Sequence, residues 1–493
     1  MLSLLIGVWV EAQPDWADLA RQDIEFASQT LMENHPGPVN NLDPGFADRL
    51  GAARQSALAL AARAETDLGY RAAVWHFGAR FNDNHLGIGS FISSPGYRWP
   101  GQILVRTIDG EMRVASQHFE DGPPAGSRLV SCNGIDPDTL LRDREFRFGG
   151  VEARETDWIL HAPRLFLDRA NPFLEPLTSC RYIRPGETDA ETYPLSWREV
   201  DIRDWMAHVD ASRGGPQTYA TGLQEFAPDQ FWISLPDFNP DAGTQAELDA
   251  VIAEIQARRD ELRAAERIVF DMRGNAGGSS QWGWQIASIL WSEAYLAARS
   301  PGVPAIDWRV SADNLVHVEG IAQRALDRGN PDYAAHFSRV ADAMRDALAH
   351  GEDLVRMQGN ERVHPIPDGP YQARPSGADE TAGNPVQAEV LFLNVGGDCS
   401  SACLDFADLV LSTETARMVG WMTGADSLYI EVRQVDLPSG QGRLGFPVKV
   451  YRGRARGDME AYAPDVIYSG RDFSTAALQA WVLQLPQTGD ARR

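Results

Sequence analysis

The sequence is short of basic residues and has no long apolar run. Its 493 residues include 45 lysines and arginines against 69 aspartates and glutamates, which gives a formal net charge of −24. Nucleic acids and anionic membrane surfaces would repel such a chain, so neither is an expected partner. No stretch reaches the roughly 20 apolar residues that a transmembrane helix needs, so stable membrane insertion is not expected either.

Cysteine is also scarce. The chain has only Cys132, Cys180, Cys399 and Cys403. They form no Cys-x-x-Cys pair, and no His-rich spacing accompanies them, so the sequence predicts no metal site. Nothing in it implies an organic cofactor. Core packing is the expected role for most of the four, while a bridge between Cys399 and Cys403 would require suitable geometry.

Residues 1–13 begin with an apolar run that is too short to span a bilayer. Val10 and Ala12 could be the small residues before a signal-peptidase cut, although no lysine or arginine precedes the run. An apolar first strand or helix would explain the same pattern. The expectation is a periplasmic or secreted protein, with a cytoplasmic location as the alternative.

A glycine-rich segment follows a predicted buried strand. The apolar run at residues 267–270 leads into residues 271–278, whose sequence is DMRGNAGG. Glycines at the exit of a strand let backbone N–H groups approach a developing oxyanion closely. We therefore expect the N–H of Gly277 or Gly278 to be an oxyanion donor.

Two serines stand at another strand-to-helix junction. Residues 390–395 read as a strand and residues 404–411 as a helix, with DCSSAC between them. The N-terminus of a helix favours negative charge on an attacking oxygen or a tetrahedral intermediate. Ser401 could therefore attack a carbonyl carbon while the N–H of Ala402 completes the oxyanion site. The alternative is that Ser400 and Ser401 merely cap the helix and take no part in chemistry.

The pairing of these motifs resembles the serine-peptidase family that includes the C-terminal processing peptidases, the tricorn core and the interphotoreceptor retinoid-binding protein. In register with the family's Ser-Ala-x-Glu pattern, the nucleophile falls on Ser401, with Ser400 as the fallback, and Leu404 takes the acidic position. The resemblance covers most of the chain. It implies a crotonase/ClpP-like β-α superhelix for an α/β catalytic domain.

A serine hydroxyl needs a base within hydrogen-bond reach. The processing-peptidase branch uses a lysine, but that register falls on Asp426, and the only nearby lysine, Lys449, lies in an alternating strand-like run. The tricorn-like branch uses a histidine, and residues 81–89, FNDNHLGIG, resemble its Asp-Gly-His-Thr element. An imidazole, with an ordinary pKa of about 6.5, can accept the serine proton and return it to a leaving amine. His85 is the expected general base, with Asn84 in place of the family's serine.

A third group normally orients the imidazole. The tricorn-like pattern has a glutamate shortly before a C-terminal Pro-Asp, which corresponds here to residues 457–465. Register from the Pro-Asp gives Asp458, whereas residue type favours Glu460. Both are candidates, and both could instead be surface acids on a terminal loop.

The pattern of the chain divides it into regions. They are a leader at residues 1–13, a helical cap at 14–95 that carries His85, a PDZ-like β domain at 96–215 with a helical insertion near 152–170, and a catalytic α/β domain at 216–493. Within the last, residues 246–263 read as one helix, and about 300–384 form an insertion. That insertion could be a lid, an oligomer contact or a surface decoration. The PDZ-like part could bind extended peptides or act as a spacer.

These features predict a serine-type peptidase, endopeptidase or tail-specific, that hydrolyses a peptide or protein through an acyl-enzyme. Two other classes stay open. One is a protein that binds peptides or small ligands on the same scaffold, and the other is a hydrolase of non-peptide esters or amides. A homo-oligomer is also open.

Overall fold

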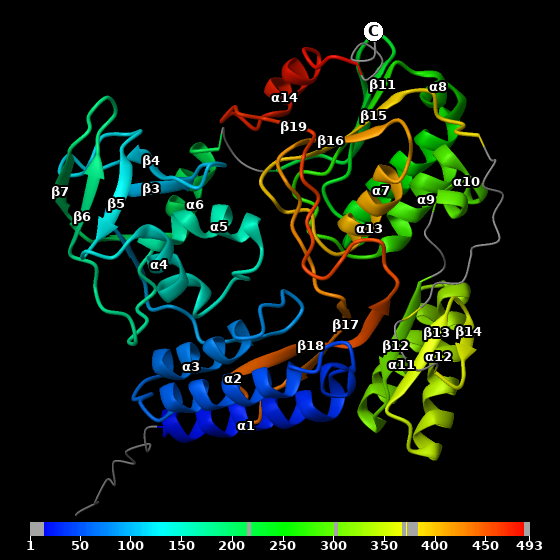
Figure 1. Cartoon of the computed structure of the whole chain (residues 1–493), viewed down its shortest axis with the longest axis horizontal. Coiled ribbons are helices and arrows are strands. Elements are labelled where there is room, and N and C mark those ends of the chain that lie inside the picture. The colour runs from blue at the N-terminus through cyan, green and yellow to red at the C-terminus, as the bar shows by residue number, and fades with distance from the viewer. Residues whose placement is uncertain (1–13, 214–217, 300–303, 367–370, 372–382, 488–493) are drawn as a thin grey trace, which may run out of the picture.

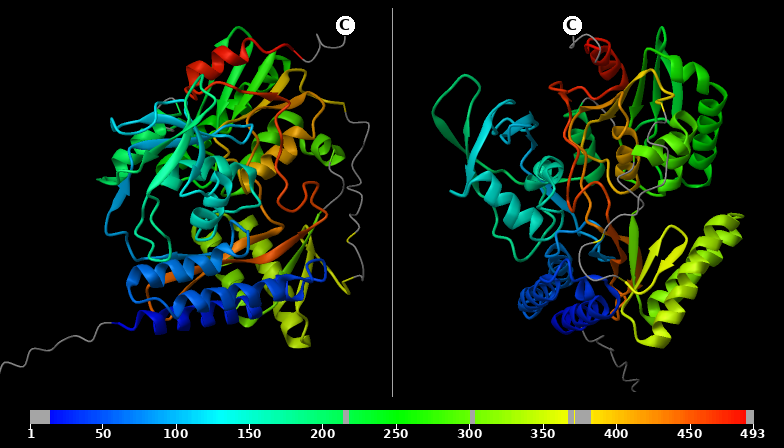
Figure 2. Two further views of the ribbon diagram at one scale, coloured as in Figure 1. Left: turned by 60° about the vertical axis from the view of Figure 1, so that its left-hand side comes forward. Right: turned by 45° about the vertical axis from the view of Figure 1, so that its right-hand side comes forward.

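The computed structural model describes residues 14–213, 218–299, 304–366, 371 and 383–487 (Figure 1). The predicted leader at residues 1–13 lies outside the described residues, as do residues 367–370 and 372–382 of the predicted insertion. A β domain and an α/β domain stand beside each other, above a layer of N-terminal helices (Figures 1 and 2). Within the described ranges, no helix is both long and apolar enough to cross a bilayer.

The predicted helical cap consists of three helices and a short 3-10 turn. They are α1 (Trp16–Asn34), η1 (Gly37–Val39), α2 (Phe46–Ala61) and α3 (Asp67–Ala79). The side chain of Asp15 accepts a hydrogen bond from the Asp18 N–H and so caps α1, and Thr66 caps α3 in the same way. Helix α1 stops at His35, because the residue before a proline avoids the helical region.

The β domain contains a five-stranded antiparallel sheet in the order β3-β4-β5-β6-β7. Its strands are β3 (Gln102–Arg106), β4 (Met112–Gln117), β5 (Arg128–Cys132), β6 (Ser179–Ile183) and β7 (Ala190–Pro194), beside the pair β2 (Tyr97–Trp99) and β8 (Arg198–Val200). Helical turns fill the connection from β5 to β6, and α6 (Ile202–Ala211) follows β8; the turns are α4 (Pro137–Leu141), η2 (Arg142–Phe146), α5 (Glu155–His161) and η3 (Ala162–Phe166). A disulfide joins Cys132 to Cys180 at opposed positions of β5 and β6. The likeness to a PDZ module stays a prediction.

The α/β domain is built on a six-stranded sheet in the order β19-β16-β15-β11-β10-β9. The strands are β9 (Gly222–Ala227), β10 (Gln230–Ser234), β11 (Arg267–Asp271), β15 (Glu389–Asn394), β16 (Ala416–Gly420) and β19 (Val466–Ile467), and only β9 runs antiparallel to its neighbour. The helices are α7 (Ala242–Ala257), α8 (Arg259–Ala264), α9 (Ser280–Trp291), α10 (Glu293–Arg299), α13 (Ala402–Leu411) and α14 (Thr475–Val482). The α/β class is thus confirmed, while the superhelix stays a prediction.

Both faces of this sheet are covered by helices, which explains why β11 and β15 are buried throughout and read as continuous apolar runs. Alternate residues go to opposite faces. Phe270 and Phe392 pack with the helices α7, α9 and α13, whereas Val269 and Leu391 pack toward α14. The sheet therefore holds β11 and β15 side by side in a rigid core.

A second six-stranded sheet lies against the helical cap. It runs β1-β18-β12-β13-β14, and β17 pairs with β18. The strands are β1 (Gly87–Ser90), β12 (Ala305–Arg309), β13 (Leu354–Gln358), β14 (Glu361–Val363), β17 (Tyr429–Asp436) and β18 (Gly442–Arg452), and the helices α11 (Ala312–Asp327) and α12 (Pro331–His350) connect β12 to β13. The predicted insertion thus extends this sheet through β12, which pairs with β18.

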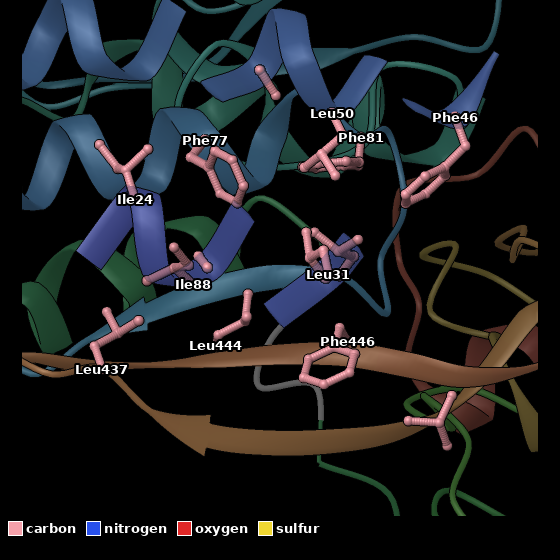
Figure 3. Packing of buried hydrophobic residues seen from close by; sticks show 14 of the residues in the cluster. Ile24, Leu31, Phe46, Leu50, Phe77, Phe81, Ile88, Leu437, Leu444 and Phe446 are labelled. Atoms are coloured by element: carbon pink, nitrogen blue, oxygen red, sulfur yellow. The ribbon is translucent and has the colours of Figure 1, made fainter. Parts of the chain in front are cut away.

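The cap, the β17–β18 hairpin and the insertion share one hydrophobic core. Figure 3 shows side chains of the cap facing Leu444 and Phe446 of β18. Trp308 and Phe337, from the insertion, belong to the same buried cluster. This packing holds the start of β1, and with it the segment that carries His85, against the shared core.

Candidate active site

The two sequence motifs meet at one edge of the α/β sheet. Strands β11 and β15 are parallel neighbours, so their C-terminal ends open on the same side. A Cβ added to Gly277 would lie 2.7 Å from the Ser401 Cβ and 2.6 Å from the Ser400 carbonyl oxygen. Gly277 also has φ +106°. Only glycine permits this conformation and this close approach, so the glycine loop lies directly against the predicted nucleophile.

Ser401 has an unusual backbone conformation, with φ 53° and ψ −123°. A non-glycine residue in such a region costs roughly 1–3 kcal/mol, and such strain clusters at functional sites. Ser401 occupies the N-cap position of α13, yet among the described residues its side chain makes no capping hydrogen bond. Its carbonyl accepts the N–H groups of Leu404 and Asp405 instead. Helix capping therefore does not explain why a serine hydroxyl stands at this position.

The predicted oxyanion donors differ in their availability. The Gly277 N–H donates to Asn275 Oδ1 at 3.0 Å, and the Asn275 side chain is fixed by donating to the Leu235 carbonyl at 2.8 Å. Gly278 follows with φ +133°, against the backbone of Phe238. This arrangement favours Gly278, rather than Gly277, as the partner of Ala402 in receiving an oxyanion.

We expect Gly277→Ala to lower the rate of acyl transfer by about 100- to 1,000-fold, the loss typical of a disrupted oxyanion site. The added Cβ would displace Ser400 and Ser401. The measurement is kcat/KM on an ester or peptide substrate. Gly351→Ala is the matched control, because Gly351 also has positive φ but has no atom within 4 Å of the added Cβ. Equal rates for both variants would contradict the assignment of the glycine loop.

His85 is held in an orientation suited to a base. Its Nδ1 lies 3.0 Å from the Tyr429 carbonyl oxygen. A carbonyl can only accept, so Nδ1 carries the proton and Nε2 presents a lone pair. Asp43 and Asn40 hold the Tyr429 hydroxyl in turn, at 2.9 and 2.8 Å. The imidazole is therefore anchored through Tyr429 to the helical cap.

Asp83 is the carboxylate that lies beside His85. Its Oδ1 accepts the His85 N–H at 2.8 Å and is 3.8 Å from His85 Nδ1. Ser427 donates to the other oxygen at 2.8 Å. Burial raises the pKa of Asp83, and the nearby imidazole opposes this rise. Sequence reasoning assigned no role to Asp83 or Tyr429, although Asp83 stands two residues before His85 in the quoted motif.

Each of the two acids predicted from the sequence accepts a hydrogen bond from a backbone N–H group. Asp458 accepts the Leu428 N–H at 2.8 Å, and Glu460 accepts the Gly457 N–H at 2.6 Å. Both are exposed, and among the described residues no hydrogen bond or ion pair joins either of them to the imidazole, whose ring partners are Tyr429 and Asp83. The charge of Asp458 nevertheless contributes to raising the pKa of Asp83. Their role in orienting His85 stays a prediction.

We expect Asp83→Asn to lower kcat by roughly 100-fold, the size of loss that a misplaced catalytic group can cause. The amide keeps the shape of the side chain but removes the charge beside His85. Single-turnover kinetics would measure the chemical step. Asp458→Asn and Glu460→Gln, measured in parallel, rank the three acids, and a larger loss in either of them than in Asp83→Asn would contradict this ranking.

No lysine is placed to act as the base. Lys449 is the only lysine of the chain. It lies in β18, where its Nζ is 3.1 Å from Glu431 Oε2 and 4.8 Å from the centre of the Trp308 ring. Asp426, at the lysine register, is buried and accepts a hydrogen bond from Arg454 at 3.0 Å. Neither position supplies an amine to Ser401.

The short segment from Gly424 to Tyr429 packs against Ser400 at one end and bonds to His85 at the other. A Cβ on Gly424 would be 2.4 Å from Ser400 Oγ, while the Tyr429 carbonyl holds the imidazole. Five residues at full extension span about 18 Å, which sets an upper limit on the separation of these two anchor points. Within the described ranges no hydrogen bond links His85 to Ser401. That the two residues act in one site therefore stays a prediction.

A pocket of about 420 Å³ opens beside the His85 loop. Its apolar walls are Trp75, Leu86, Ile88, Phe148 and Val151, and its polar lining includes Asp83, Asn84, Arg154, Asp157 and Arg169.

Arg154 connects this pocket to the nucleophile loop, the turn that carries Ser400 and Ser401. It donates to Ser400 Oγ at 3.0 Å, and the preceding N–H, of Ala153, donates to Asn82 at 3.3 Å. The β domain therefore touches both halves of the site. No group of three or more potential metal ligands occurs within the described ranges.

Comparison with known proteins gives matches in structure only. No family model matches the sequence, and no curated protein matches it. The structure of mature CPAF is 14% identical, covers 95% of this chain and 97% of its own, and has a TM-score of 0.59. The structure of mature CPAF complexed with lactacystin is also 14% identical, covers 95% of this chain and 99% of its own, and has a TM-score of 0.57. The photosystem II D1 C-terminal processing protease, at 13% identity with 92% of this chain and 94% of its own covered, reaches a TM-score of only 0.31, which carries no weight for the fold.

These matches extend over nearly the whole length of the chain, so they include the cap, the β domain and the α/β domain together. At 14% identity they report the fold and leave the chemistry to be argued from the residues. The chain has the fold of CPAF, while its resemblance to the C-terminal processing peptidases is carried by the sequence motifs.

Proposed function

We propose that this protein is a serine-type peptidase that forms an acyl-enzyme on Ser401, with His85 as the general base. The observation that carries the proposal is the conformation of Ser401. Its backbone is strained, its side chain makes no cap, and a glycine loop with backbone donors lies against it. Strain of this kind persists only where the surroundings enforce it, which supports a catalytic role.

The proposed reaction begins when His85 Nε2 accepts the proton of the Ser401 hydroxyl as Oγ attacks the scissile carbonyl carbon. The N–H groups of Gly278 and Ala402 receive the oxyanion, and the positive end of α13 favours its charge. The tetrahedral intermediate then collapses, and the imidazolium gives its proton to the leaving amine. Water attacks the acyl-enzyme by the same route in reverse, which releases the acid and restores Ser401.

This mechanism requires His85 and Ser401 to approach within hydrogen-bond distance when a substrate is bound. Catalytic hydrogen bonds often tighten only in the substrate complex. Arg154 and Ala153 contact the nucleophile loop and the His85 loop respectively, so a peptide in the pocket would touch the segment that joins them. In this proposal, binding of the substrate therefore brings His85 and Ser401 together.

The pocket supports an extended peptide that inserts an apolar side chain among Trp75, Phe148 and Val151. Whether cleavage is internal or near the C-terminus of the substrate belongs to the same proposal. A periplasmic or secreted location is proposed as well. The disulfides Cys132–Cys180 and Cys399–Cys403 support it, because disulfides persist in oxidising compartments.

The test is labelling of the purified protein with a fluorophosphonate, location of the adduct by mass spectrometry, and a peptide-library digest. An adduct on Ser401 together with peptide cleavage would support the proposal. Labelling with turnover of esters but of no peptide would replace it by a non-peptide hydrolase. Absence of labelling in well-folded protein would favour a binding protein on this scaffold.

A further inference from the structure

The predicted nucleophile stands inside a small covalent ring. Cys399 and Cys403 form a disulfide with a Cα–Cα distance of 5.3 Å, and Ser400, Ser401 and Ala402 lie between them. Both half-cystines are fully buried in the core beneath the α/β sheet, next to residues such as Phe406. The ring therefore ties both ends of the nucleophile turn to the buried core of the domain.

The other contacts of this turn are non-covalent. The Ser400 carbonyl accepts the Cys403 N–H at 3.1 Å, and the Ser400 hydroxyl accepts a hydrogen bond from Arg154. These bonds hold Ser400 and the first turn of α13. Ser401 itself keeps positive φ, a conformation that L-residues other than glycine rarely adopt. A covalent link across the turn is the contact best suited to keep it there.

We propose that the Cys399–Cys403 disulfide is a positioning device for Ser401, so that full reactivity of the nucleophile requires the closed bridge. This inference rests on the proposed function. It predicts that the two disulfides of the chain have separable roles. The bridge Cys132–Cys180 closes a loop of 48 residues, whereas Cys399–Cys403 closes one of 4. In the chain-entropy picture the longer loop adds more to global stability than the shorter one.

The experiment compares two double variants with the unmodified full-length protein. In Cys399→Ala/Cys403→Ala we expect the rate of fluorophosphonate labelling to fall at least tenfold, with kcat lowered more than KM is changed. The melting temperature should change little. In Cys132→Ala/Cys180→Ala we expect the reverse pattern, with a clearly lower melting temperature and labelling within about twofold of the unmodified protein.

A redox arm uses folded Cys132→Ala/Cys180→Ala protein, in which only the bridge of interest remains. Dithiothreitol supplies two electrons and two protons, so the disulfide becomes two thiols while the reagent closes to its cyclic disulfide. Oxidised glutathione reverses this by accepting the electrons and leaving as two glutathione molecules. Labelling should fall on reduction and return on reoxidation, with the thiol state followed by alkylation and mass spectrometry.

The outcomes separate the two proposals. Labelling that is unchanged both in Cys399→Ala/Cys403→Ala and after verified reduction would overturn the positioning role while leaving the peptidase proposal intact. If the first variant does not fold, the redox arm decides by the same criterion. Failure of the oxidised, unmodified protein to label at all would instead count against the proposed function.

Discussion

Replacing Ser401 by alanine is expected to abolish fluorophosphonate labelling and to reduce peptide hydrolysis by about a million-fold, the loss seen when the nucleophile of a serine protease is removed. Removal of Oγ leaves the glycine loop and α13 in place, so any remaining rate reports substrate binding and the oxyanion donors alone. Fold should be retained, because the Ser401 side chain makes no capping bond.

Ser400→Ala is the matched control for this variant. Ser400 is buried, and its hydroxyl accepts a hydrogen bond from Arg154. Its loss should change kcat/KM by no more than about 150-fold, the upper end of what one hydrogen bond to a charged group contributes. An adduct found on Ser400, or a larger loss in Ser400→Ala than in Ser401→Ala, would move the nucleophile to the neighbouring position.

The second large effect is expected from His85→Ala, with a loss in kcat of about 10,000-fold or more. In the proposed mechanism the imidazole removes the proton from the Ser401 hydroxyl, so without it the adduct with a fluorophosphonate should form at a correspondingly low rate. Because the ring is anchored to the Tyr429 carbonyl, its removal should leave the β17–β18 hairpin folded. Circular dichroism and a melting curve would check this.

Two controls define the base. His350→Ala removes an exposed histidine that bonds to the Asp346 carbonyl, and it should leave activity unchanged. Lys449→Met removes the only lysine and should retain most activity, although loss of the pair with Glu431 will lower stability slightly. Full activity in His85→Ala combined with inactivity in Lys449→Met would replace the Ser-His mechanism by a Ser-Lys one.

The parts of the site that follow from local sequence could be predicted. The glycines after β11 and the serines after β15 are each set by a strand and the turn that follows it, and parallel strands bring such turns to one edge. His85 was selected as a candidate base from its flanking residues, and Asp83 in the same motif was passed over. The Tyr429 carbonyl and the Ser427 hydroxyl could not be predicted, because each lies 344 positions away in the chain from the residue it contacts, His85 and Asp83 respectively.

Other predictions failed or fell short for similar reasons. Residues 246–263 read as one helix, but α7 ends at Ala257 and α8 begins at Arg259, because Arg258 leaves the helical conformation with ψ 15°. For the insertion, a lid, an oligomer contact and a surface decoration were left open, and these alternatives stay open. What the sequence did not indicate is that the insertion supplies β12, β13 and β14 to a sheet whose other strands, β1, β17 and β18, come from distant parts of the chain. Strand pairing across such separations leaves no periodic signal in the sequence.

The strand β1, which follows His85 directly, is paired only with β18, and Gly87 lies opposite Gly445. A chain that emerges from the ribosome in order therefore produces His85 early and the nucleophile much later, and produces the strand that seats the base later still. Contacts between such distant segments form slowly, after the intervening regions have collapsed. A nascent or truncated chain that ends before Gly442 thus contains Ser401 but lacks the strand that pairs with β1, so in the proposed mechanism its base would not yet be firmly placed.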